Sequence, residues 1–188
     1  MKKTLQTLVL AFVAVLTTQA QVTLNDVTLP AKITKDNSSL SLNGGGIRKK
    51  AFFKLYTAGL YTTEKSKNGT EIQNADKAVA IQLTITSSLI SSSNMSEAIQ
   101  EGFEASMKGN TAPLKDKIAS FINTFKKEEI KEGDVFEIWY IPAVGVKSYK
   151  NGKLQGTIAG LDFKKALFGI WLSDTPVDAD LKKGLLGQ

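Results

Sequence analysis

The stretch over residues 47–63, IRKKAFFKLYTAGLYTT, is the most strand-like part of the chain and constrains its fold more than any other. Successive side chains of a strand point to opposite faces. Both faces are largely apolar here, which is typical of a strand covered on both sides. The sequence therefore predicts a central strand with other layers packed against it. One face would hold Phe53, Leu55, Thr57, Gly59 and Tyr61, and the other Phe52, Lys54, Tyr56, Ala58 and Leu60.

The rest of the chain predicts blocks of strands and helices. Residues 22–29 predict a first strand, 35–39 a turn and 66–74 a polar loop, with further strands at 40–42, 78–85, 135–141, 146–149 and 154–158. Asn151–Gly152 is a hairpin signal. Apolar residues at helical spacing predict helices from Met95, after Pro113, over 163–172 and over 179–186, the last two capped by Asp162 and Asp178. This order predicts one α+β domain, with helices laid on a mostly antiparallel sheet.

The N-terminus has the features of a cleavable export signal. Lys2 and Lys3 are basic, residues 8–16 form an unbroken apolar run, and 18–20 offer small residues where a signal peptidase reads. The run is shorter than the ~20 residues that span a bilayer. We expect a signal peptide over 1–20, a periplasmic or secreted domain over 21–188, and no membrane span after cleavage. A retained N-terminal anchor is the alternative.

The chain contains no cysteine and no histidine. Ser-His-Asp and Cys-His catalysis, disulfides and the common zinc sites are therefore excluded, and we expect no metal and no cofactor. The net charge is +6, and loss of two lysines with the leader leaves 22 basic against 18 acidic residues. The basic residues form scattered pairs, among them Lys126–Lys127 and Lys164–Lys165. We interpret these pairs as solvated surface and do not expect nucleic-acid binding.

Arg48 is the one arginine among the 24 basic residues. Its planar guanidinium can hold a carboxylate with a geometry that lysine cannot copy, so it is the first candidate for a functional side chain. A structural ion pair with a buried Asp or Glu is the alternative. Gly44–Gly45–Gly46 lies just before it and permits close approach of backbone or ligand. The spacing of these glycines is not that of a phosphate-binding motif.

Two blocks of the sequence resemble the chalcone isomerase-like family, in its bacterial exported branch. The first is Gly46–Ile47–Arg48 followed by residues 53–61, FKLYTAGLY, and the second is residues 170–187, IWLSDTPVDADLKKGLLG. Strands and helices in compatible order lie between them, so the resemblance covers nearly the whole mature chain. It implies an open-faced β-sandwich, in which a large antiparallel sheet carries a layer of helices, with a ligand cleft between the two.

The resemblance also implies which side chains meet a ligand. Arg48 matches the arginine that lies near the substrate phenolate in the family's enzymes and meets the carboxylate in its fatty-acid-binding members. The other four polar groups of the enzymes fall at Tyr56, Met95, Gly102 and Ile170. The groups that organise a catalytic water are thus replaced, which removes electrostatic help that oxyanion chemistry needs. We therefore expect no catalytic residues of the chalcone isomerase type.

Three functions remain open on these residues. The first is a non-catalytic binder of a small apolar anion such as a fatty acid, held by Arg48 and Tyr56 and walled by Met95, Phe103 and Ile170. The second is an enzyme of an unknown isomerase- or lyase-type reaction, with Tyr56 as a general acid whose pKa Arg48 lowers. The third is a protein-interaction module, which would expose an apolar patch.

Overall fold

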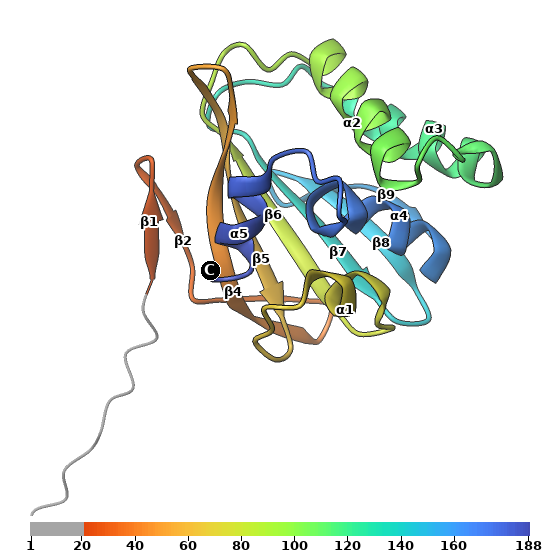
Figure 1. The fold of residues 1–188 in the computed structure, drawn as a ribbon. Helices are drawn as coiled ribbons and strands as arrows, with labels where there is room; N and C mark the ends of the chain where they lie inside the picture. Colours follow the sequence, from red (N-terminus) through yellow and green to blue (C-terminus); the bar gives the residue numbers. More distant parts are fainter. Residues whose placement is uncertain (1–20) are drawn as a thin grey trace, which may run out of the picture.

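A curled seven-stranded sheet forms the frame of the protein, whose computed structural model describes residues 21–188 (Figure 1). The strands lie side by side in chain order, and each pairs antiparallel with the next, as the sequence predicts. The predicted leader over 1–20 lies outside the described residues. The strands of the sheet are β3 Lys32–Lys35, β4 Ser38–Lys50, β5 Phe53–Thr62, β6 Val79–Ile85, β7 Val135–Ile141, β8 Gly145–Lys150 and β9 Lys153–Ile158.

The predicted central strand over 47–63 is in fact two strands of a hairpin. β4 runs through the three glycines as far as Lys50, and β5 begins at Phe53 after a turn at Ala51–Phe52. The prediction of one continuous strand is therefore wrong, because Ala-Phe carries no turn signal. From Tyr56 onward β5 is buried on both faces, as expected of a central strand.

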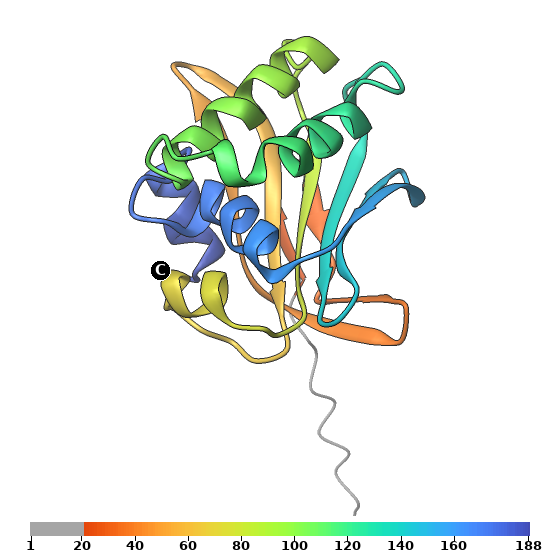
Figure 2. The ribbon, with the colours of Figure 1, turned by 90° about the vertical axis from the view of Figure 1, so that its right-hand side faces the viewer.

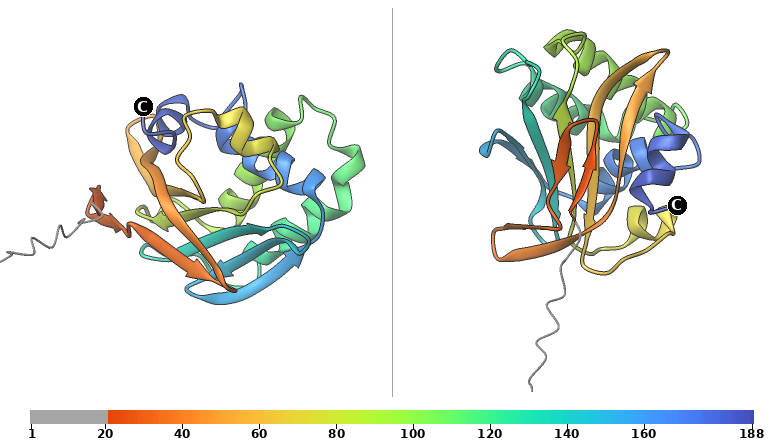
Figure 3. Two further views of the ribbon diagram at one scale, coloured as in Figure 1. Left: turned by 90° about the horizontal axis from the view of Figure 1, so that it is seen from below. Right: turned by 90° about the vertical axis from the view of Figure 1, so that its left-hand side faces the viewer.

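The predicted first strand over 22–29 is also a hairpin. β1 (Val22–Leu24) and β2 (Val27–Leu29) pair through a two-residue turn in which Asn25 and Asp26 both have positive φ. Asn and Asp tolerate that conformation, and the resulting turn matches the twist of the strands. The hairpin lies against the outer face of the sheet, away from the helices (Figure 3).

The helices cover the opposite, concave face (Figure 2). They are α1 Gly69–Asn74, α2 Ser92–Ser106, α3 Lys115–Phe125, α4 Leu161–Leu172 and α5 Ala179–Leu185, with the 3-10 turn η1 Ala112–Leu114 before α3. The segment predicted as a polar loop over 66–74 thus contains α1. Asp178 caps α5 as predicted, whereas Gly160 precedes α4 and Asp162 lies in its first turn. No helix within residues 21–188 is long and apolar enough to cross a membrane.

Two apolar clusters lie on the two sides of the sheet. The larger fills the space between the concave face and the helices, and the smaller lies under the β1–β2 hairpin around Leu29, Tyr61 and Trp139. This arrangement is the α+β domain that the sequence pattern predicts, and it has the open-faced sandwich form that the family resemblance implies. Trp139 and Trp171 are both buried.

Lys164 corrects the interpretation of the lysine pairs as solvated surface. Its side chain is fully buried, and Nζ donates to the carbonyls of Ile72, Gln73 and Ala75 at 2.6, 2.9 and 2.8 Å. These carbonyls lie at the C-terminus of α1. The last carbonyls of a helix have no N–H partner within the helix, and the helix dipole favours a cation beside them. Burial lowers the pKa of Lys164 to about 8.

Candidate functional site

The main cavity of the described chain lies between the sheet and the helical layer, where β4 ends and β5 begins. Its volume is about 580 Å³. The sheet contributes Leu83 and Ile138, whereas α2 contributes Met95 and Ile99. The wall is completed by Arg48, Lys50, Phe53, Leu55, Tyr56, Leu89, Ile90, Asn94, Glu97, Ala98, Glu101, Gly102, Ala105, Phe121, Phe125, Ile170, Trp171 and Val177.

The apolar wall follows from the periodicity of the elements around it. Residues 95, 98, 99, 102 and 105 of α2 lie three and four positions apart and so share one helical face. Gly102 brings this helix close to α4, because a Cβ there would lie 2.9 Å from Cγ2 of Ile170. The acidic Glu97 and Glu101 of the same helix also line the cavity, and both are exposed to solvent.

Arg48 and Tyr56 form the polar end of the cavity. They are directly paired across β4 and β5, which brings their side chains to the same face of the sheet. Arg48 Nη1 lies 3.4 Å from Oδ2 of Asp178 and also donates to the carbonyl of Lys49. Within residues 21–188 both of these bonds come from Nη1, so Nε and Nη2 remain available as donors.

Asp178 has several partners besides the arginine. Its carboxylate caps α5 by accepting from the backbone N–H groups of Asp180 and Leu181, at 2.9 and 3.0 Å, and it accepts from the N–H of Lys49 at 3.1 Å. Burial acts to raise the pKa of Asp178. The N–H donors and the charge of Arg48 outweigh it, so the pKa lies below its ordinary value.

Tyr56 is buried, and its hydroxyl accepts a hydrogen bond of 3.1 Å from Nε1 of Trp171. This bond leaves the hydroxyl proton free to be donated toward the cavity. Burial raises the pKa of Tyr56 to about 12, although the Trp171 bond and the charge of Arg48 act in the opposite direction. The pKa is therefore raised rather than lowered, contrary to what the enzyme hypothesis requires of a tuned general acid.

The family model described as chalcone isomerase-like matches residues 21–187, almost the whole described chain. The chain belongs to the chalcone isomerase-like family. The crystal structure of the Arabidopsis thaliana fatty-acid binding protein AtFAP1 has a similar fold, with a TM-score of 0.74 and 18% sequence identity over 89% of this chain and 96% of that one. No curated protein matches the sequence.

Four of the five residues expected to meet a ligand line the cavity of this chalcone isomerase-like domain, namely Arg48, Tyr56, Met95 and Ile170. Phe103 does not. It is fully buried in the larger apolar cluster, with its ring centroid 5.6 Å from that of Phe163 and 6.3 Å from that of Phe121. Phe103 follows Ile99 by four residues and Gly102 by one, so helical spacing alone could not separate a wall residue from a core residue.

Sequence reasoning missed two polar partners at the site. The sequence predicts Asp178 only as a helix cap and assigns Trp171 no polar contact, whereas the two side chains bond to Arg48 and Tyr56. Their partners Arg48 and Tyr56 lie 130 and 115 residues away in sequence. The sequence gives one indication of these partners, which is the alternative that Arg48 forms a structural ion pair with an Asp or Glu. Asp178 is the acidic residue that pairs with it.

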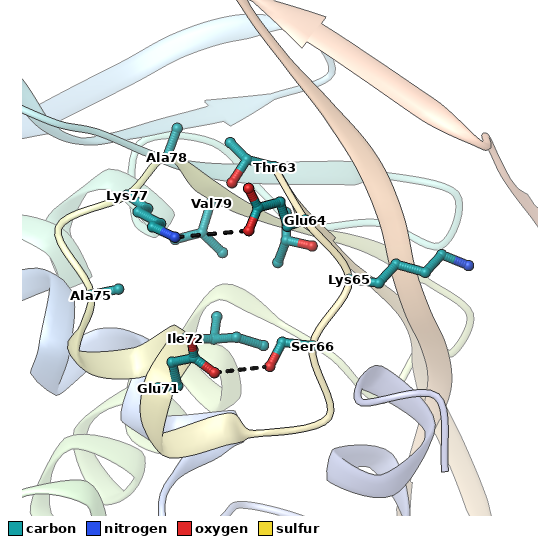
Figure 4. Close-up of a pocket in the computed structure, with 11 residues that line it drawn as sticks. Thr63, Glu64, Lys65, Ser66, Glu71, Ile72, Ala75, Lys77, Ala78 and Val79 are labelled. Carbon is teal, nitrogen blue, oxygen red and sulfur yellow. Dashed lines mark hydrogen bonds and ion pairs between the residues drawn. The ribbon is translucent and has the colours of Figure 1, made fainter.

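A smaller hollow lies at the other end of β5, between the loop after that strand and the segment from α1 to β6 (Figure 4). Its volume is about 130 Å³. Figure 4 shows that polar and apolar side chains line it, with Lys77 3.9 Å from Glu64 and Ser66 3.3 Å from Glu71. Its size is far below the range of ordinary ligand sites, so we assign it no ligand.

Proposed function

We propose that this protein binds a fatty acid, or another small apolar anion, without chemical conversion. The observation that carries the proposal is an apolar cavity of about 580 Å³ with an arginine and a tyrosine hydroxyl at one end. The carboxylate would meet Nε and Nη2 of Arg48 and the hydroxyl of Tyr56, and the tail would lie along α2. Such charge-assisted hydrogen bonds are about twice as strong as neutral ones.

The dimensions and chemistry of the cavity support this ligand class. Sites for small molecules commonly measure about 300–1,000 Å³ and are mainly apolar with a few convergent polar groups. The structurally similar AtFAP1 is described as a fatty-acid binding protein, which adds support for the same class of ligand. The Asp178 carboxylate does not exclude a second carboxylate, because its contact with the guanidinium is through Nη1 alone.

A catalytic role has less support. Met95 and Ile170 stand where the resemblance places polar groups in the family's enzymes, and Gly102 has no side chain to offer. The hydroxyl of Tyr56 would be a poor proton donor at neutral pH, because its pKa is raised to about 12. We therefore propose a carrier or sensor of the ligand rather than an isomerase.

The test is direct binding of a long-chain fatty acid such as palmitate to the protein after removal of co-purified lipid. Native mass spectrometry should show one palmitate per chain. Arg48→Ala should weaken binding roughly tenfold or more, since it removes a charge-assisted pair. Arg48→Lys should restore part of the loss, because it returns the charge without the planar fork.

Lys115→Ala is the matched control, since it removes one exposed positive charge from α3, away from the cavity. It should leave palmitate affinity unchanged. Absence of any palmitate complex, or an affinity that Arg48→Ala does not alter, would overturn the proposal.

A further inference from the structure

The tip of the β4–β5 hairpin exposes aromatic side chains. All six residues from Lys49 to Lys54, KKAFFK, are exposed. Phe52 is 100% exposed and Phe53 56%, while Leu89 in the loop before α2 is 48% exposed. The tip projects at one end of the sheet, at the end where α2 begins (Figures 1 and 3). Water is a poor solvent for a fully exposed phenylalanine, so a partner that covers it would gain free energy.

Positive charge surrounds these aromatic side chains. Lys49, Lys50 and Lys54 flank the two phenylalanines in sequence, and within residues 21–188 none of the three is in an ion pair. The recorded polar contact of the Lys54 ammonium is with the amide oxygen of Asn25 at 3.0 Å. A cluster of unpaired lysines around exposed apolar groups is complementary to a surface that is both anionic and apolar.

The turn at the tip contains a left-handed alanine. The turns at Asn25–Asp26, Asp36–Asn37 and Asn151–Gly152 use residues that tolerate positive φ, whereas Ala51 at the tip has φ 53° and Ala143 in the β7–β8 turn has φ 63°. A left-handed conformation costs an ordinary L-residue roughly 1–2 kcal/mol. The left-handed Ala51 therefore lowers local stability at a turn that also exposes Phe52.

The tip is continuous with the ligand cavity. Lys50, Phe53 and Leu89 line the mouth of the cavity as well as belonging to, or lying beside, the exposed tip. A partner seated on the tip would thus also lie against the opening through which an apolar ligand enters. This continuity, together with the charge, favours a lipid surface over a partner that would bury the tip alone.

We propose that the β4–β5 tip docks on an anionic lipid bilayer, with Phe52 and Phe53 inserted among the lipids and the lysines on the headgroups. The inference rests on the proposed function, since it gives the apolar anion a path between bilayer and cavity that avoids water. Lys49, Lys50 and Lys54 form no ion pair within residues 21–188, and anionic headgroups would supply their negatively charged partners.

Vesicle binding tests the proposal. Residues 21–188 are the suitable protein, because they hold every described strand and helix and both apolar clusters, and because the apolar run at 8–16 would itself bind lipid. Phosphatidylcholine vesicles with and without phosphatidylglycerol are compared by co-sedimentation. Binding should require the anionic lipid and fall with salt.

The variants distinguish vesicle binding through the tip from nonspecific binding through other exposed apolar residues. Phe52→Ser should weaken binding about tenfold and Lys50→Glu at least fivefold. Val144→Ser is the control, since Val144 is 42% exposed but lies in the turn between β7 and β8, at the opposite end of the sheet. In Phe52→Trp the fluorescence maximum should shift to shorter wavelength on vesicles, because Trp139 and Trp171 are already buried.

Each outcome is decisive. Loss of binding in Phe52→Ser but not in Val144→Ser supports docking through the tip. Absence of vesicle binding overturns docking, and if palmitate still binds, the proposed ligand site stands without it. Equal binding of Phe52→Ser and the unaltered protein also overturns it. Self-association that Phe52→Ser abolishes, without vesicle binding, would assign the tip to a second copy of the chain instead.

Discussion

At the scale of single residues, the Arg48–Asp178 pair governs how much charge the cavity offers a ligand. The two side chains are 18% and 14% exposed, so their interaction is only partly screened by water. Asp178→Asn should raise palmitate affinity up to about fivefold, because the arginine is no longer partly neutralised. Asparagine also caps helices well, so α5 should persist. Isothermal titration would check the affinity, and a weaker complex would contradict this account.

Lys164 makes stability depend on pH. Its pKa is about 8 in the folded protein, against 10.5 for a free lysine side chain. Between these values the unfolded chain holds more protons than the folded one, so the free energy of unfolding should rise with pH across that window. Below pH 8 both states are protonated and the dependence ceases.

The variant Lys164→Met isolates this contribution. It should destabilise the protein by about 1–3 kcal/mol near neutral pH, because three buried or partly buried carbonyls at the C-terminal end of α1 lose their donor. It should also lose the rise in stability between about pH 8 and 10.5. Urea unfolding at several pH values measures both effects, with Lys115→Met as an exposed control. An unchanged pH profile would show that Lys164 does not titrate in that window.

At the scale of elements, the triple glycine permits α5 to lie directly on β4. A Cβ at Gly44 would lie 2.3 Å from the carbonyl oxygen of Gly184, and one at Gly184 would lie 2.5 Å from that of Gly45. Gly44→Ala should therefore destabilise the fold by about 1–3 kcal/mol through overpacking. Thermal unfolding would show a melting temperature lower by several degrees, while Thr157→Ala on the exposed face of β9 should change little. An unaffected Gly44→Ala would mean that α5 can move away without loss.

Which elements could be predicted depended on whether their signals were local. Period-two and helical patterns located β6, β7 and α3, and Asn151–Gly152 located the hairpin of β8 and β9. The hairpin at Ala51–Phe52 was missed because its turn residues are atypical, and α1 because it is short and polar. Neither has a pattern that distinguishes it from its surroundings, and tertiary packing determines both.

The lining of the cavity was predictable to the extent that the family resemblance indicated it. Arg48, Tyr56, Met95 and Ile170 all line the cavity, but Phe103 is a core residue that does not line it. The partners that adjust the polar end, Asp178 and Trp171, come from the far end of the chain. Their proximity is a consequence of the sheet order and of how α4 and α5 fold back onto β4 and β5, which no local pattern encodes.

At the scale of the whole molecule, the first strand begins next to the predicted cleavage point. β1 begins at Val22, one residue after the predicted cleavage point, so removal of residues 1–20 would leave every described strand and helix in place. We propose that the protein acts outside the cytoplasm, and we predict that protein recovered from an exporting cell begins at Gln21. Ala20→Asp should block cleavage, because signal peptidases read a small residue there. Intact-mass measurement of periplasmic, secreted and cytoplasmic fractions checks both forms, and an unprocessed cytoplasmic chain would contradict export.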